Sequence, residues 1–111
     1  MTTVDQWTTV CPYDDLLPER GVAALVGGRQ VAVFRAFDGV LYAIDNRDPF
    51  TGAFVLSRGI VGTKGIRQVV ASPLHKQSFD LSDGRCLDDP SVQVATYPIR
   101  LRGGSVEVSV W

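Results

Sequence analysis

Residues 22–35, VAALVGGRQVAVFR, contain two apolar runs that are separated by Gly27-Gly28. The tight turns that join neighbouring antiparallel strands need positive φ at their central residues, and glycine adopts that conformation without a steric cost. The stretch therefore predicts a β-hairpin that pairs residues 22–26 with residues 29–35.

Further glycine turns extend this pattern toward both halves of the chain. Asp38-Gly39 separates the hairpin from VLYAID (40–45), which adds a third strand. Near the other end, YPIRLR (97–102) and SVEVSVW (105–111) alternate apolar and polar residues on either side of Gly103-Gly104. Alternation with a period of two is typical of a strand with one buried face, so a second hairpin is expected here.

The middle of the chain is less regular. IRQVVAS (66–72) and SFDLSDG (78–84) are strand candidates, whereas Asn46 to Gly65 has the character of one long irregular stretch. The best helical candidate is a single turn around Tyr13–Leu17. A long loop in a compact domain usually has a function, so the middle region is where a site is expected.

These patterns predict one all-β domain over residues 1–111, an antiparallel sandwich or barrel with little or no helix. The core strands are expected at about 7–45 and 91–111, and a loop-rich region at about 46–90. A chain of 111 residues has the size of a single domain.

Charge and hydropathy argue against two classes of partner. The chain has 11 Lys and Arg against 12 Asp and Glu, and its basic residues are scattered, whereas nucleic-acid binding needs a basic face. No apolar run approaches the roughly 20 residues that span a bilayer. The first residues, MTTVDQWTTV, lack the pattern of a signal peptide, which predicts a cytoplasmic protein.

Cys11 and Cys86 are far apart, and neither belongs to a Cys-x-x-Cys pair. In a reducing cytoplasm they are expected to be free thiols rather than a disulfide or a zinc site. Cys86 is expected to be a small buried side chain, and Asp88-Asp89-Pro90 a turn. Lys64, Arg67 and Lys76 are either a docking patch for an acidic surface or ordinary scattered charge.

Two loops share a polar residue before proline: NRDPFTGAFVLSRG (46–59) and ASPLHKQSFDLSDG (71–84). They resemble the two cluster-binding loops of Rieske iron–sulfur domains, in which the first loop carries Cys-x-His and the second Cys-x-x-His. The resemblance places those four ligand positions on Asp48, Phe50, Ser72 and His75. Three ligands are then missing, because phenylalanine offers no donor and a serine hydroxyl is a poor ligand. A conventional 2Fe-2S cluster is not expected.

A narrower resemblance rests on DNRDPFTGAFVLSRGIVG (45–62), SPLHKQSFDL (72–81) and DGRCLDDP (83–90). These stretches are similar to the small subunit of the assimilatory NAD(P)H-dependent nitrite reductase, a Rieske-like protein without its cluster. The resemblance implies a partner, a large subunit that carries FAD, a 4Fe-4S cluster and sirohaem and reduces nitrite to ammonium. This chain would then hold no cofactor, metal or catalytic residue of its own.

Loss of a metal cross-link removes a stabilising term, and we expect a polar and apolar contact in its place. Asp48 is expected to accept a hydrogen bond from Ser72 or His75. Phe50, Phe54 and Leu74 are candidate anchors for docking on the large subunit, because buried aromatic anchors are typical of stable interfaces. The alternative is that Phe50 and Leu74 are core residues beneath a loop.

His75, the only histidine, has three possible roles. The favoured one is a loop residue that hydrogen-bonds a neighbour such as Asp48. A metal ligand acting with Cys11 or Cys86 is disfavoured by their spacing. An Asp48–Ser72–His75 hydrolase triad lacks the other sequence marks of such enzymes.

Two other functions stay open beside that of an accessory subunit. One is a stand-alone Rieske-type ferredoxin that carries electrons, which the missing ligands disfavour. The other is an orphan protein-binding module on the same fold, since a fold does not determine a function.

Overall fold

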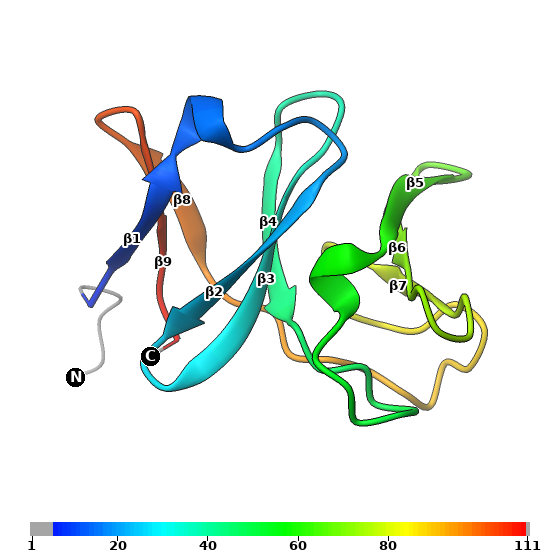
Figure 1. The fold of residues 1–111 in the computed structure, drawn as a ribbon. Helices are drawn as coiled ribbons and strands as arrows, with labels where there is room; N and C mark the ends of the chain where they lie inside the picture. The colour runs from blue at the N-terminus through cyan, green and yellow to red at the C-terminus, as the bar shows by residue number, and fades with distance from the viewer. Residues whose placement is uncertain (1–5, 111) are drawn as a thin grey trace.

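The computed structural model describes residues 6–110. This part of the chain forms three antiparallel sheets of three strands each, with two single-turn 3₁₀ helices, η1 (Tyr13–Asp15) and η2 (Leu56–Arg58) (Figure 1). The sheets are β1 (Thr8–Pro12), β9 (Ser105–Val108) and β8 (Ile99–Arg102); β2 (Gly21–Val26), β3 (Arg29–Arg35) and β4 (Leu41–Asp45); and β5 (Ile60–Lys64), β6 (Arg67–Ala71) and β7 (Ser78–Asp80).

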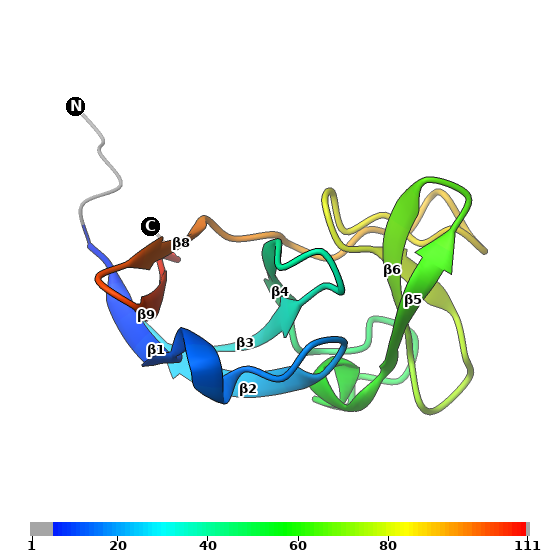
Figure 2. The same cartoon turned by 90° about the horizontal axis from the view of Figure 1, so that it is seen from above.

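The molecule has two lobes, which Figures 1 and 2 show side by side. The first two sheets form a barrel-like lobe, and the third sheet with its long loops forms the other. The segment before β8 closes the barrel by pairing with β4, where Asp45 N donates to Ala95 O and Tyr97 N donates to Ala43 O, each at 2.9 Å. The all-β prediction with little helix is confirmed.

Strand β3 lies between two cores. Its central side chains alternate, as strand geometry requires, and Val31, Ala32, Val33 and Phe34 are all 0% exposed. Val31 and Val33 face the barrel core, whereas Ala32 and Phe34 face a core shared with the loop lobe. The barrel-side core also contains Leu16, Val26, Ala43, Val106 and Val108, and the shared core contains Ile44, Leu56, Val61, Val70, Phe79, Leu81, Cys86 and Val94. This strand therefore fixes the loop lobe to the barrel.

The glycine turns lie where the sequence predicts them. Gly27 and Gly28 have φ of 56° and 80°, and the flanking residues Val26 and Arg29 pair directly. The predicted hairpin of β2 and β3 is thus confirmed, as are β4, β6, the start of the 78–84 strand and the last hairpin. The helical turn around Tyr13–Leu17 is present as η1, although shorter.

The prediction of an irregular stretch from Asn46 to Gly65 is wrong in its second half. Ile60–Lys64 forms β5, which pairs along its whole length with β6, and η2 precedes it. The sequence IVGTK carries a weak strand pattern, and its strand character comes from pairing with β6 and from burial of Val61 in the shared core. None of the helices in residues 6–110 is long or apolar enough to cross a membrane.

Two sequence predictions reach beyond the described residues. The sequence predicts that the last strand runs to Trp111, whereas β9 ends at Val108, and Ser109 and Val110 are not in a strand. Trp111 itself and residues 1–5, where the stretch without a signal-peptide pattern begins, lie outside the described residues.

Candidate functional site

The first of the two loops turns at Asp48. Asp48 N donates to Ala53 O at 2.8 Å, and Gly52 N donates back to Asp48 O at 2.7 Å. Gly52 has φ of 80°, a conformation that favours glycine. Within this turn the side-chain Oδ1 of Asp48 accepts a hydrogen bond of 2.8 Å from Phe50 N. The backbone of this turn thus directs the N–H group of Phe50 at the carboxylate of Asp48, the first residue of the turn.

The second loop repeats this turn at Ser72. Ser72 N donates to Gln77 O at 2.9 Å, and Lys76 N donates to Ser72 O at 3.0 Å. Lys76 takes the place of Gly52, with φ of 61°. Leu74 N donates to Ser72 Oγ at 3.3 Å, as Phe50 N does to Asp48. The two loops therefore present Asp48 and Ser72 from equivalent positions.

A buried hydrogen bond joins the loops. Ser72 Oγ lies 2.6 Å from Asp48 Oδ2 and donates to it, and the two residues are 1% and 0% exposed. The expectation that Ser72 bonds Asp48 is confirmed. Each carboxylate oxygen of Asp48 thus accepts one hydrogen bond, which a carboxylate removed from water requires.

His75 does not take part in this contact. Its side chain is exposed, and it makes no hydrogen bond within residues 6–110. The predicted bond between His75 and Asp48 is therefore wrong. A hydrolase triad is not formed either, because the Ser72 hydroxyl donates its hydrogen bond to Asp48, whereas a nucleophilic serine donates to a histidine base.

The cysteines do not assemble with His75. Cys86 is 0% exposed in the shared core, as predicted. Cys11 lies on β1, where burial raises the pKa of its thiol and the charge of Asp15 adds a smaller increase. Across residues 6–110 no three His, Cys, Asp or Glu side chains gather into a group that could hold a metal ion.

Phe50, Phe54 and Leu74 lie at the surface, with 39%, 48% and 47% of their areas exposed. The interpretation of Phe50 and Leu74 as core residues is therefore wrong. Phe50 still has support from beneath, because its ring packs against the buried ring of Phe79 at a centroid distance of 6.2 Å.

The residues at the four positions that the sequence resemblance assigns to Rieske ligands do not fit a 2Fe-2S cluster. The side-chain oxygens of Asp48 and Ser72 hydrogen-bond each other and backbone N–H groups, and Phe50 has no atom that could bind a metal. His75 is the one ligand of the expected type, and it points to solvent. The donor set of two thiolates and two imidazoles is therefore absent from these positions.

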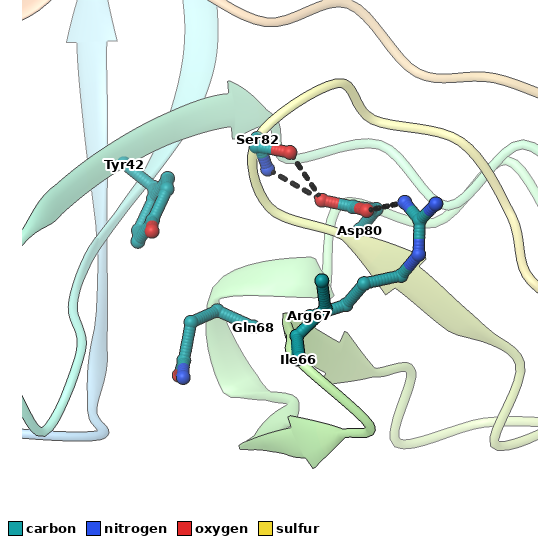
Figure 3. A pocket seen from close by; sticks show the side chains of 6 residues that line it. All are labelled: Tyr42, Ile66, Arg67, Gln68, Asp80 and Ser82. Atoms are coloured by element: carbon teal, nitrogen blue, oxygen red, sulfur yellow. Dashed lines mark hydrogen bonds and ion pairs between the residues drawn. The ribbon is translucent and has the colours of Figure 1, made fainter.

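A cavity of about 300 Å³, which the sequence patterns did not reveal, lies elsewhere on the molecule (Figure 3). None of its lining residues belongs to the turns that begin at Asp48 and Ser72: Tyr42, Ile66, Arg67, Gln68, Asp80 and Ser82. Arg67 is paired with Asp80, whose other oxygen accepts bonds from Ser82 N at 2.8 Å and Ser82 Oγ at 2.6 Å. Burial alone would raise the pKa of Asp80, but the Ser82 and Arg67 contacts outweigh it and lower that pKa.

Arg67 and the acidic pair Asp88-Asp89 have partners within the structure. The guanidinium of Arg67 forms an ion pair with Asp80, so Lys64, Arg67 and Lys76 are not three unpaired cations. The predicted turn at Asp88-Asp89-Pro90 is confirmed: Val92 N donates to Asp89 O at 2.9 Å, and Asp88 Oδ2 accepts from Ser78 N at 2.7 Å.

Comparison with known families gives one assignment. Residues 6–109 match the family described as Rieske-like [2Fe-2S] domain. A crystal structure from Mycobacterium tuberculosis, provisionally described as an NADH-dependent nitrite reductase small subunit, superposes with a TM-score of 0.93 at 53% identity. That alignment covers 96% of each chain.

Two curated relatives carry related names. The nitrite reductase (NADH) small subunit of Salmonella typhimurium is 46% identical over 106 residues, 95% of this chain and 98% of the relative. The NAD(P)H nitrite reductase large subunit of Klebsiella oxytoca is 41% identical over 102 residues. That match covers 92% of this chain and 11% of the Klebsiella protein, so a domain like this one forms part of a longer polypeptide there.

Proposed function

This chain belongs to the family of Rieske-like [2Fe-2S] domains, and we propose that it is the small subunit of an NADH-dependent nitrite reductase. The observation that carries the proposal is the match to the Salmonella small subunit, which runs through 95% of this chain and 98% of the relative. The proposed reaction of the complex is reduction of nitrite to ammonium during nitrate and nitrite assimilation in the cytoplasm.

The small subunit itself is proposed to be catalytically silent. The positions where a Rieske domain holds its iron carry Asp48, Phe50, Ser72 and an outward His75, and this donor set supports a domain without a conventional 2Fe-2S cluster. FAD, a 4Fe-4S cluster and sirohaem would then all belong to the large subunit. The same residues disfavour a stand-alone Rieske-type ferredoxin, which needs a cluster to carry electrons.

The Klebsiella relative supports a direct partnership with the large subunit. There, a domain similar to this chain occupies part of a polypeptide that is named as the large subunit. Domains fused in one protein and separate in another commonly work in the same complex, so we propose that this chain binds its large subunit. An orphan binding module with a different partner offers no explanation for that fusion.

The docking surface is proposed to be the tip formed by the two loops. Phe50, Phe54 and Leu74 are exposed apolar side chains on the loops that replace the cluster site. Burying a fully exposed large apolar side chain contributes roughly 1.5–3 kcal/mol, and these side chains, with under half of their areas exposed, would each contribute part of that to the contact. The support from Phe79 holds the Phe50 ring in place for binding.

A pull-down from cells grown on nitrate tests the proposal. The tagged chain should retain a large protein, and the eluate should show sirohaem absorption. A chain that elutes alone and colourless would contradict the nitrite reductase assignment and favour an orphan binding module. A chain that elutes alone with bound iron and sulfide would favour the ferredoxin alternative.

A further inference from the structure

A continuous hydrogen-bond chain connects the backbones of two proposed anchors. Leu74 N–H donates to Ser72 Oγ at 3.3 Å, and the Ser72 hydroxyl donates to Asp48 Oδ2 at 2.6 Å. The other oxygen of Asp48 accepts from Phe50 N–H at 2.8 Å. The chain therefore begins and ends at the residues whose exposed side chains would contact the partner.

The two central groups are closed off from water. Asp48 and Ser72 are 0% and 1% exposed, so no solvent can replace a lost partner without opening the loops. Hydrogen bonds in such a buried network reinforce one another, and losing one weakens the rest. The loops are thereby held in one discrete relative arrangement.

A third turn in the same chain shows that this connection is not a general property of the turn. Asp80 N donates to Arg85 O, Gly84 N donates to Asp80 O, and Ser82 N donates to Asp80 Oδ1, as in the loops at Asp48 and Ser72. In this turn, however, the second carboxylate oxygen of Asp80 (Oδ2) pairs with Arg67, a half-exposed residue of β6, and not with another loop. The bond across two loops thus belongs specifically to the turns that carry Phe50 and Leu74.

From this geometry we infer that Asp48 and Ser72 are a positioning pair, which couples Phe50 to Leu74 and sets their relative placement for the large subunit. The docking part of this inference rests on the proposed function. The pair touches no partner itself; it acts by removing the freedom of one loop relative to the other before binding.

Amide hydrogen exchange in the isolated protein tests the coupling. Ser72→Ala should raise the exchange rate of Phe50 N–H at least tenfold, although Phe50 makes no hydrogen bond to Ser72. Ser82 N–H, in the matched turn at Asp80, should keep its rate. Ser72→Thr, which retains the hydroxyl, should restore the slow exchange. Unchanged exchange at Phe50 in Ser72→Ala would overturn the coupling, and so would an equal rise at Ser82, because that would indicate general loosening.

A binding cycle with the purified large subunit tests the docking role. Ser72→Ala should raise the dissociation constant about tenfold in the wild-type background and less than twofold in a Leu74→Ala background. Without Leu74 the second loop carries no proposed anchor whose position the pair could set, whereas a general loss of folding would weaken both backgrounds equally. An undiminished effect in the Leu74→Ala background would overturn the positioning role.

The two failures are distinguishable. If the wild-type chain does not bind the large subunit, the proposed function fails and the docking role fails with it, while the exchange measurement still determines whether the coupling exists. If the wild type binds but the Ser72→Ala effect does not depend on Leu74, the proposed function stands and the positioning pair is refuted.

Discussion

Ser72 and Asp48, 24 residues apart in sequence, share a hydrogen bond of 2.6 Å in the interior of the molecule. Each is the first residue of the same kind of turn, so their side chains meet between the two loops. The sequence resemblance aligns these loops with the two that a metal joins in a cluster-bearing Rieske domain, and in this chain a carboxylate and a hydroxyl connect them. Four measurements test this contact and other features of the structure.

The first concerns stability. Ser72→Ala should lower the free energy of unfolding by about 1.5–3 kcal/mol, because the buried Asp48 carboxylate loses a hydrogen bond that water cannot replace. Urea unfolding measures it. The matched control is Ser91→Ala, since Ser91 Oγ donates to Asp89 Oδ1 at the same 2.6 Å but in an exposed turn. The control should cost less than about 0.5 kcal/mol, and equal effects would show that burial of the Ser72 bond has no special value.

The second concerns docking. Phe50→Ala and Leu74→Ala should each weaken binding to the large subunit by about 1–2 kcal/mol, because each removes an apolar anchor from the proposed interface. Binding is measured by calorimetry. Ile66→Ala is the control: Ile66 is 98% exposed but lies beside the cavity of Figure 3 and not on either loop. An effect of Ile66→Ala as large as the others would move the interface to the β5–β6 hairpin.

The third concerns iron. The purified wild-type chain should contain less than stoichiometric iron and acid-labile sulfide, even after reconstitution with ferrous iron and sulfide, because only His75 among the four ligand positions carries a suitable donor. Elemental analysis and the visible spectrum report this. A ligand-complete Rieske ferredoxin, reconstituted in parallel, is the positive control. One cluster per chain would refute the loss of the site.

The fourth measurement concerns the stability of the fold at acidic pH. The pKa of Asp80 is lowered in the folded protein, because hydrogen bonds from Ser82 and Arg67 outweigh the effect of burial. The folded state thus favours the ionised form, and this contribution is present above the unfolded pKa, near 3.9, and is lost as the pH falls toward the folded pKa. Asp80→Asn should flatten the fall in unfolding free energy below about pH 4.

Urea unfolding at a series of acidic pH values measures this slope. Asp14→Asn, which removes an exposed carboxylate in η1, controls for the change in net charge. If Asp80→Asn and Asp14→Asn leave the same slope as the wild type, the contacts of Asp80 do not govern acid stability.

Local signals in the sequence predicted what local geometry controls. Gly27-Gly28 specifies a hairpin turn through its positive φ values, and the alternation in 97–102 and 105–111 predicts the last hairpin, because both effects act between residues close in the chain. The resemblance carried by the two proline-containing loops also identified the Rieske-like fold.

The burial of β3 on both faces required the tertiary structure. The run Val31–Phe34 is apolar throughout, which indicates burial but not what covers each face. One face meets β9 of the barrel and the other meets β6 and β7 of the loop lobe, segments 32 or more residues away in the sequence. The strand β5 escaped detection for the same reason, since pairing with β6 creates it.

By itself, the sequence determined the all-β class, the hairpins and the absence of thiolates at the four ligand positions, because these depend on residue identity and short spacings. Only the tertiary structure decided that Ser72 and not His75 bonds Asp48, and that Phe50 and Leu74 face outward. Ser72 stands first in its turn and faces Asp48, whereas His75 stands fourth and faces solvent. That choice arises from the packing of two loops against one core, a relationship between residues that are distant in the chain.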